Sequence, residues 1–347
     1  MIKPLDDIIT NEFIPALFGS NVSANERELF AMPIKDGGLG IKIWHKHANI
    51  SYETSKGFTA PLQDQILNQK YDLPDQSKVK SAKDKSISAM KLFISQDNEN
   101  IFNRQTLASK RNLTQLSKLG SSSWLSALPL EDQGFNLNKS EFQDAVNLRY
   151  DKTLKRLPAK CPCGSQFTIT HAMNCHRGGF INSRHDAIRN FEGRMLKQVC
   201  SDVEIEPMLQ PIVNTVFHRS ANISNEARLD LRAKSFWRQG QNAFFDVRIT
   251  NADCNSQQDK DISSILKKHE QEKKRAYNSR IMEIDQGTFT PLIYTVKGAT
   301  GSECQIFHKN MAEKISIKSN ERYEDVSRFI RVKLSSLVLK AALQCIR

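Results

Sequence analysis

Three cysteines and a histidine occur within fifteen residues of one another. Their order, Cys161, Cys163, His171 and Cys175, gives the spacing C-x-C-x7-H-x3-C. Zinc takes such ligands in a tetrahedron, and Cys₃His is one of its ordinary structural sets. A segment this short cannot build a hydrophobic core of its own, so a bound metal would order it. We therefore predict a structural zinc site in residues 158–182, closed because four protein ligands leave no open position.

The residues around this cluster favour the same interpretation. Gly164 permits the tight turn that follows the first two cysteines. His171 and Cys175 are four positions apart, so one turn of helix would bring both to one face. His176 or His185 could replace one ligand, and reduced cysteines without metal are the alternative. The remaining cysteines are isolated and are predicted to be core or surface residues: Cys200, Cys254, Cys304 and Cys345.

The charge of the chain is concentrated in its second half. The 347 residues hold 50 Lys and Arg against 38 Asp and Glu, a net charge of +12. Residues 1–150 hold 18 basic and 17 acidic side chains, a net charge of +1, whereas residues 151–347 hold 32 and 21, a net charge of +11. Such asymmetry indicates where a polyanion such as nucleic acid would bind. The alternative is a solvated basic surface without a ligand.

The composition narrows the class of protein. With 39% apolar and 25% charged residues the chain is expected to be globular, and its length suggests about two domains. It has no apolar run long enough to span a membrane, and Asp6 and Asp7 fall where a signal peptide would be apolar. Seven unevenly spaced cysteines argue against a disulfide framework. We therefore expect an intracellular protein, in the nucleus if it binds DNA. The sequence leaves the oligomeric state open.

Hydrophobic periodicity predicts a mixed α+β fold. Helical spacing dominates a small unit at 1–58 and a further region at 59–157. Beyond residue 183, short apolar runs predict strands at 203–205, 227–231, 243–250 and 290–296. They alternate with predicted helices at 183–200, 262–284, 302–314 and 323–345. Strands interleaved with helices predict a mixed sheet flanked by helices in residues 183–347, after the Cys/His segment.

Two aspartates occur in the predicted strands. Asp230 ends the sequence Arg228-Leu-Asp230, and Asp246 begins Asp246-Val-Arg248, sixteen positions from Asp230. A hairpin or two neighbouring strands could bring both carboxylates to one end of a sheet. Two hard oxygen ligands can hold Mg²⁺, which bridges to a phosphate and activates water. Arg248 stays protonated and cannot serve as a base, so a lysine would have to come from elsewhere.

Further candidates for this site lie on predicted helices. Lys273 and Tyr277 are four apart and share one helix face, with Lys274 as the alternative lysine. Glu192, on the helix after the Cys/His segment, is a candidate further metal ligand. Taken singly, each of these residues could equally be a salt-bridge partner or part of a solvated surface.

In their order along the chain, these motifs resemble the C-terminal region of LINE-type retrotransposon polyproteins that carry a restriction-like endonuclease. After the Cys/His knuckle come Arg184-His185, Val203-Glu-Ile-Glu-Pro207, Arg228-Leu-Asp230, Asp246-Val-Arg248 and Lys273-x3-Tyr277. The linker that follows the polymerase in such elements is similar to Phe13-Ile-Pro-Ala-Leu17 and to Leu29-Phe-Ala-Met-Pro33 followed by Gly37-Gly-Leu-Gly40. The polymerase motif Tyr-x-Asp-Asp does not occur, so the resemblance implies a detached or truncated tail of such a polyprotein.

The resemblance implies a PD-(D/E)xK nuclease core and an enzyme that hydrolyses phosphodiester bonds. In that family the enzyme nicks target DNA so that its 3′ end primes reverse transcription. Asp230 and Asp246 would then hold a catalytic Mg²⁺, and Lys273 or Lys274 would support the attacking water. Arg248 would steady the phosphate. The implied partner is DNA, with RNA of the element as a further one.

Two positions depart from the family pattern. Leu229 stands where a proline is expected, but that proline is not a ligand. Arg248 stands where a lysine is expected, so cleavage requires Lys273 or Lys274 in its place. If neither serves, the domain binds DNA without cutting it. The alternative function is therefore a catalytically inactive, zinc-dependent nucleic-acid-binding remnant of the polyprotein, and a third is a scaffold with a basic surface.

Overall fold

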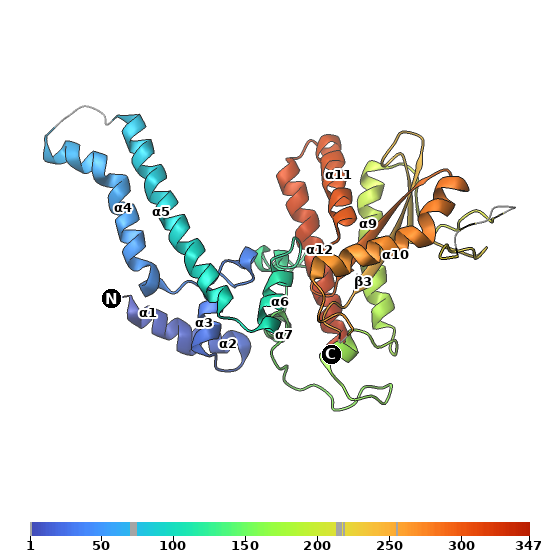
Figure 1. The fold of residues 1–347 in the computed structure, drawn as a ribbon, viewed down its shortest axis with the longest axis horizontal. Coiled ribbons are helices and arrows are strands. Elements are labelled where there is room, and N and C mark those ends of the chain that lie inside the picture. Colours follow the sequence, from blue (N-terminus) through green and yellow to red (C-terminus); the bar gives the residue numbers. More distant parts are fainter. Residues whose placement is uncertain (1, 70–74, 213–216, 218, 255) are drawn as a thin grey trace. The chain divides into compact units, whose positions relative to one another are not determined.

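The computed structural model describes residues 2–69, 75–212, 217, 219–254 and 256–347. They form two compact units, Met1–Leu113 and Thr114–Arg347 (Figure 1). Among the described residues, no helix is both long enough and apolar enough to cross a membrane.

All the elements that the structure describes in the first unit are helices. Its elements are α1 (Lys3–Ile8), η1 (Ile9–Phe13), α2 (Ile14–Phe18), α3 (Ala24–Ala31), η2 (Ile34–Asp36), α4 (Trp44–Leu67) and α5 (Gln76–Asn103), after which α6 (Leu107–Leu116) continues into the second unit. The Asp6 carboxylate accepts hydrogen bonds from the backbone N–H groups of Trp44 and His45 at 2.9 and 2.7 Å. These bonds satisfy donors at the start of α4 that have no partner within the helix. Residue 58, at which the sequence predicts a boundary, lies within α4.

A four-stranded sheet organises the second unit. Its strands are β1 (Val203–Ile205), β2 (Leu231–Lys234), β3 (Asn242–Thr250) and β4 (Thr288–Thr295), in the order β1-β2-β3-β4. The first two pairings are antiparallel, whereas β3 and β4 are parallel. Parallel neighbours need a crossover connection, and α10 (Ile262–Glu283) lies in it.

Helices cover both faces of this sheet (Figure 1). The remaining elements are η3 (Ser123–Ser126), α7 (Lys139–Arg149), α8 (Ile169–Ala172), α9 (Phe180–Val199), α11 (Ser302–Ser319) and α12 (Tyr323–Ile346). Phe245 and Val247 of β3 pack with α9, α11 and α12 in the main core. Phe244, which points the other way, packs with Ile281 of α10. The predicted mixed α+β class, with a sheet flanked by helices, is confirmed at this level.

The centre of the main core is aromatic. The Phe245 ring lies 5.5 Å from that of Phe236 and 4.9 Å from that of Phe307, measured between centroids, and all three side chains are fully buried. We expect Phe245→Ala to lower the free energy of unfolding of this unit by about 3–5 kcal/mol, because it removes buried surface and leaves a cavity. The measurement is urea unfolding followed by tryptophan fluorescence, in which Trp237 reports on the core because its ring packs on Phe236.

The matched control is Phe329→Ala on α12, because the Phe329 side chain is exposed. It should cost much less stability than Phe245→Ala. Equal losses for the two variants would show that the unit does not depend on this aromatic core.

Candidate functional site

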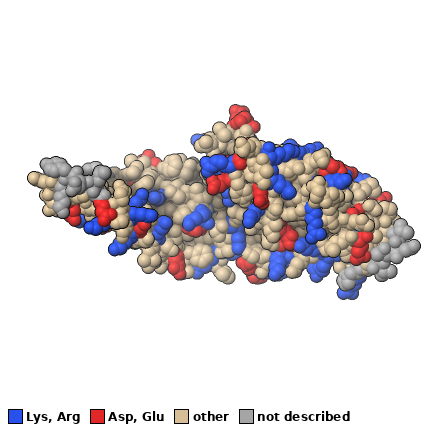
Figure 2. All heavy atoms as spheres, turned by 90° about the horizontal axis from the view of Figure 1, so that it is seen from above, with Lys and Arg blue, Asp and Glu red and all other residues tan. Residues whose placement is uncertain are grey.

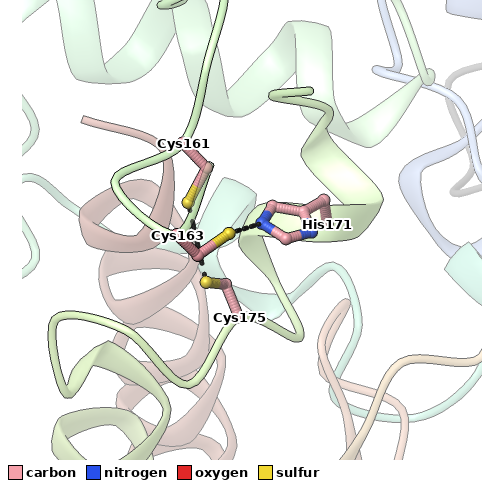
Figure 3. Close-up of side chains that lie close together, drawn as sticks. All are labelled: Cys161, Cys163, His171 and Cys175. Atoms are coloured by element: carbon pink, nitrogen blue, oxygen red, sulfur yellow. Dashed lines mark hydrogen bonds between the residues drawn. The ribbon is translucent and has the colours of Figure 1, made fainter. Parts of the chain in front are cut away.

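The four ligands predicted from the sequence converge in the structure (Figure 3). The sulfur atoms of Cys161, Cys163 and Cys175 and a ring nitrogen of His171 all lie within 4.8 Å of one another. Cys161 Sγ is 3.6 Å from Cys175 Sγ, and Cys163 Sγ is 3.2 Å from His171 Nε2. Ligand atoms about 2.0–2.3 Å from a tetrahedral zinc ion are roughly 3.5–3.8 Å apart. The cluster could therefore hold a metal ion.

A tight turn positions the first two cysteines. Cys161 N donates to Ser165 O at 2.9 Å, and Gly164 N donates to Cys161 O at 2.8 Å. Gly164 has a φ of +91°, a conformation that side chains with a Cβ rarely adopt. Hydrogen bonds from the Ser165 side chain and backbone lower the pKa of the Cys163 thiol to about 6. The turn thus favours the thiolate, which is the form that binds metals.

The other two ligands come from α8 and the loop after it. Thr168 caps this helix through a hydrogen bond from His171 N to Thr168 Oγ1 at 3.0 Å. The helix ends at Ala172, so Cys175 lies beyond it. The predicted shared helical turn of His171 and Cys175 is therefore wrong, although both side chains reach the cluster. His176 is exposed and does not belong to the group of four.

Asp246 lies in β3, and Asp230 immediately precedes β2. Leu231, the first residue of β2, pairs with Phe245 of β3, so Asp230 and Asp246 each adjoin this pair. Asp230 Oδ2 accepts a hydrogen bond from Val247 N at 2.6 Å, which holds this carboxylate against β3. Burial raises the pKa of the Asp246 carboxyl; Lys273 opposes the shift, and the charge of Asp230 adds to it.

Of the two candidate lysines, Lys273 is the one at the acidic pair. Its Nζ atom is 2.6 Å from Asp246 Oδ2 and lies over the ring of Tyr277, 5.7 Å from the centroid. The neighbouring Lys274 pairs instead with Glu303 of α11, with Nζ 2.6 Å from Oε1. Consecutive residues of a helix point about 100° apart, which explains the different partners. The structure therefore brings together Asp230, Asp246 and Lys273.

His185 also lies at this site, a placement that the sequence analysis missed. Its Nε2 is 3.1 Å from Asp230 Oδ2, and its Nδ1 is 3.3 Å from Asp186 Oδ1. The hydrogen bond with Asp230 is the main cause of the raised pKa of His185, and burial alone would lower that pKa. The sequence offered His185 as an alternative zinc ligand. In the order of motifs, His185 comes between the Cys/His segment and Asp230, which hinted at a role beside Asp230. The order of motifs does not show, however, which strand the start of a helix faces.

Glu192 lies on the other side of the sheet. Its side chain is fully buried, and its Oε1 atom accepts a hydrogen bond from the Tyr294 hydroxyl at 2.7 Å and lies 2.8 Å from His308 Nε2. Tyr294 is three positions beyond Pro291, the register partner of Asp246. An odd number of positions along a strand exchanges its faces, so Glu192 and Tyr294 meet on the face opposite Asp246. The structure does not bring Glu192 to the acidic pair.

The remaining predicted residues surround the pair. Arg248 follows Asp246 by two positions and so points to the same face of β3. Its Nη1 atom is 2.9 Å from Glu272 Oε2 of α10. Tyr277 accepts a hydrogen bond from Asn222 Nδ2 at 3.2 Å and packs against the Phe289 ring, 5.7 Å away. Both side chains are therefore held by neighbours close to Lys273 and Asp246.

The comparisons with protein families and with curated proteins found no relative of this chain. No model of a known protein family matches this sequence, and no significant match was found among curated proteins.

The buried contact of Glu192 with His308 predicts a pH-dependent contribution to stability. Burial disfavours the charged imidazole, but the neighbouring Cys304 and Glu192 raise the pKa of His308 well above 6.5. The stabilisation is therefore complete below the unfolded-state pKa of about 6.5 and is lost as the pH rises through the higher folded-state pKa. We expect His308→Gln to cost about 1–3 kcal/mol near pH 6 and less near pH 9, measured by urea unfolding.

Tyr294→Phe is the matched control, because it removes a neutral donor to the same Glu192 oxygen. Its cost should stay nearly constant over this pH range. A cost of His308→Gln that is constant, or that grows with pH, would contradict a charged His308 in the folded protein.

Proposed function

We propose that this protein is a metal-dependent DNA endonuclease of the restriction-like type that LINE retrotransposons carry. The observation that carries the proposal is the meeting of two carboxylates and an ammonium group beside β3 of the mixed sheet. Lys273 Nζ lies 2.6 Å from Asp246 Oδ2, and Asp230, just before β2, accepts a hydrogen bond from the backbone of Val247, the residue after Asp246.

The chemistry of these groups suits phosphodiester hydrolysis. Asp230 and Asp246 would hold Mg²⁺, for which carboxylate oxygens are the preferred protein ligands. When bound, Mg²⁺ would stabilise charge that develops on the phosphate and make water a better nucleophile. Once the Asp246 carboxylate binds the metal ion, Lys273 would be free to orient that water. Arg248, on the same face and partly exposed, would contact the phosphate with the donors that Glu272 leaves free.

Protein groups stabilise the two carboxylates as they stand. The ammonium group of Lys273 faces Asp246, and His185 forms a hydrogen bond with Asp230 that raises the pKa of the imidazole. Both contacts offset the repulsion between neighbouring carboxylates. A metal ion would replace these contacts on the same oxygen atoms. Binding of Mg²⁺ is therefore expected to compete with Lys273 and His185.

The overall charge agrees with a nucleic-acid partner. Residues 151–347, which hold both clusters, carry a net charge of +11. On the face drawn in Figure 2, however, Lys and Arg are spread among acidic side chains and do not form one patch. The charge would thus attract DNA in general, while the acidic pair determines where it is cut. The nucleus, where such a substrate is found, is the proposed location, and RNA of the element is a further proposed partner.

The Cys₃His cluster would hold a structural zinc ion in this proposal. Its four ligands leave no open position for substrate. By ordering the segment between α7 and α9, the metal would fix the start of α9, from which His185 reaches Asp230.

One observation favours the second candidate function, a catalytically inactive zinc-dependent nucleic-acid-binding remnant. Glu192, the expected further ligand, lies on the opposite face of the sheet, so it does not join the two aspartates. This candidate requires salt-dependent DNA binding that survives Asp246→Ala and is lost with Cys163→Ser.

We expect the full chain to nick supercoiled plasmid in Mg²⁺ or Mn²⁺ and Asp246→Ala to reduce nicking to background, because one of the two metal ligands is lost. Lys273→Ala should lower the nicking rate about 100-fold. Lys274→Ala should leave it close to that of the wild type, because Lys274 pairs with Glu303. The measurement is conversion of supercoiled to open-circular DNA on gels.

The control for charge is Asp259→Ala, an exposed aspartate outside the site. Equal effects of Lys273→Ala and Lys274→Ala would exclude the assigned lysine. A wild type that binds DNA but nicks none, with either metal, would support the inactive remnant instead.

We further expect the purified protein to contain about one zinc ion per chain. Cys163→Ser should lose most of this metal and lower the thermal stability of the second unit, because the knuckle is not ordered without it. Metal content is measured by mass spectrometry after dialysis. Cys254→Ser, which changes an isolated cysteine, should keep its zinc. If Cys163→Ser retained one zinc ion per chain, or if the wild type contained none, the Cys₃His cluster would not be a zinc site.

A further inference from the structure

A cavity lies between α11, α12 and the end of β4. Its volume is about 280 Å³, close to the lower end of small-ligand pockets. One face of each helix lines the cavity, with lining residues three or four positions apart. The polar lining residues of the two helices include Gln305, His308 and Lys309 of α11 and Tyr323, Ser327 and Arg331 of α12.

The charged residues that line this cavity are basic. Lys309 and Arg331 come from different helices, and among the described lining residues none is acidic. Within the described part of the chain, Lys309 has no hydrogen bond or ion pair, and Arg331 uses only Nε, which donates to Ser327 O at 3.2 Å. Lys309 is exposed and Arg331 is half-buried. An anion bound between them would accept charged hydrogen bonds from both.

The inner wall of the cavity is rigid and partly apolar. Tyr294 and His308 are fixed there by their shared contact with the buried Glu192. Apolar side chains of Leu119, Ile330, Leu334 and Val338 complete the wall. A suitable ligand therefore has an anionic group at one end and an apolar or aromatic body at the other.

We propose that this cavity binds a nucleoside monophosphate, with the phosphate between Lys309 and Arg331 and the base against the apolar wall. Arg331 can donate two parallel hydrogen bonds to phosphate oxygens, and Lys309 adds a compact positive charge. The ligand could be a free nucleotide or the 5′-phosphorylated end of a nucleic-acid strand, since both present the same phosphomonoester. The cavity involves none of the residues of the acidic pair, so this inference does not depend on endonuclease activity.

The test is isothermal titration calorimetry, in which dAMP is added to the full chain and the heat of binding is measured. Deoxyadenosine, which lacks the phosphate, is the control ligand. We expect saturable binding of dAMP and much weaker binding of deoxyadenosine. Lys309→Gln and Arg331→Gln should each weaken dAMP binding about tenfold, because each removes a charged hydrogen bond. Lys318→Gln and Arg328→Gln remove the same charge from the same helices outside the cavity lining, and should bind as the wild type does.

Asp246→Ala should keep its affinity for dAMP, which separates this cavity from the acidic pair. Competition with oligonucleotides that carry a 5′-phosphate or a 5′-hydroxyl distinguishes the two sources of the ligand. Displacement of dAMP by the phosphorylated strand alone assigns the strand end, and no displacement by either assigns the free nucleotide. No saturable dAMP binding, equal binding of deoxyadenosine, or dAMP binding unaffected by Lys309→Gln and Arg331→Gln would each overturn the proposal.

Discussion

The alternation of side chains along β3 governs the second unit. Phe245 and Val247 enter the core formed with α9, α11 and α12, so Asp246 between them must point toward α10. A carboxylate at that depth needs a counter-charge, which Lys273 supplies from the crossover helix. The same alternation on β4 directs Tyr294 to the opposite face, where it meets Glu192. β3 and its parallel neighbour β4 thus separate an acidic site from a cavity lined by cations.

Much of the second unit follows from sequence periodicity. The helix predicted at 262–284 is α10 at Ile262–Glu283, and the strand predicted at 243–250 is β3 at Asn242–Thr250. In β3 every second residue from Ala243 to Ile249 is apolar, whereas α10 has its apolar residues towards its two ends and buries His269 and Glu270 between them. The strand predicted at 227–231 instead becomes β2 at Leu231–Lys234, because regular pairing with β1 stops at Ile205. Glu206, which follows Ile205, has a positive φ of 56° and interrupts the strand there.

The two clusters differ in how far the sequence could predict them. The Cys/His ligands lie close together in the chain, so their spacing alone identified the group that the structure brings together. The acidic site joins residues from α9, β3 and α10 with Asp230, which precedes β2, and the partners of each residue depend on packing. Periodicity could not decide between Lys273 and Lys274, because adjacent helix residues both fit the pattern. It also could not show that Glu192 faces the core while His185, seven positions earlier on the same helix, faces Asp230.

The register of the β2–β3 pair has a consequence for how this chain tolerates changes in length. A residue inserted within β3 ahead of Asp246 would exchange the two faces of the strand beyond it. The carboxylate would then turn into the aromatic core, and an apolar side chain would face Lys273. A residue inserted at the exposed positions 258–260, between β3 and α10, leaves the register of both elements unchanged. Related chains that keep the acidic pair should therefore vary in length at that connection and not within β3.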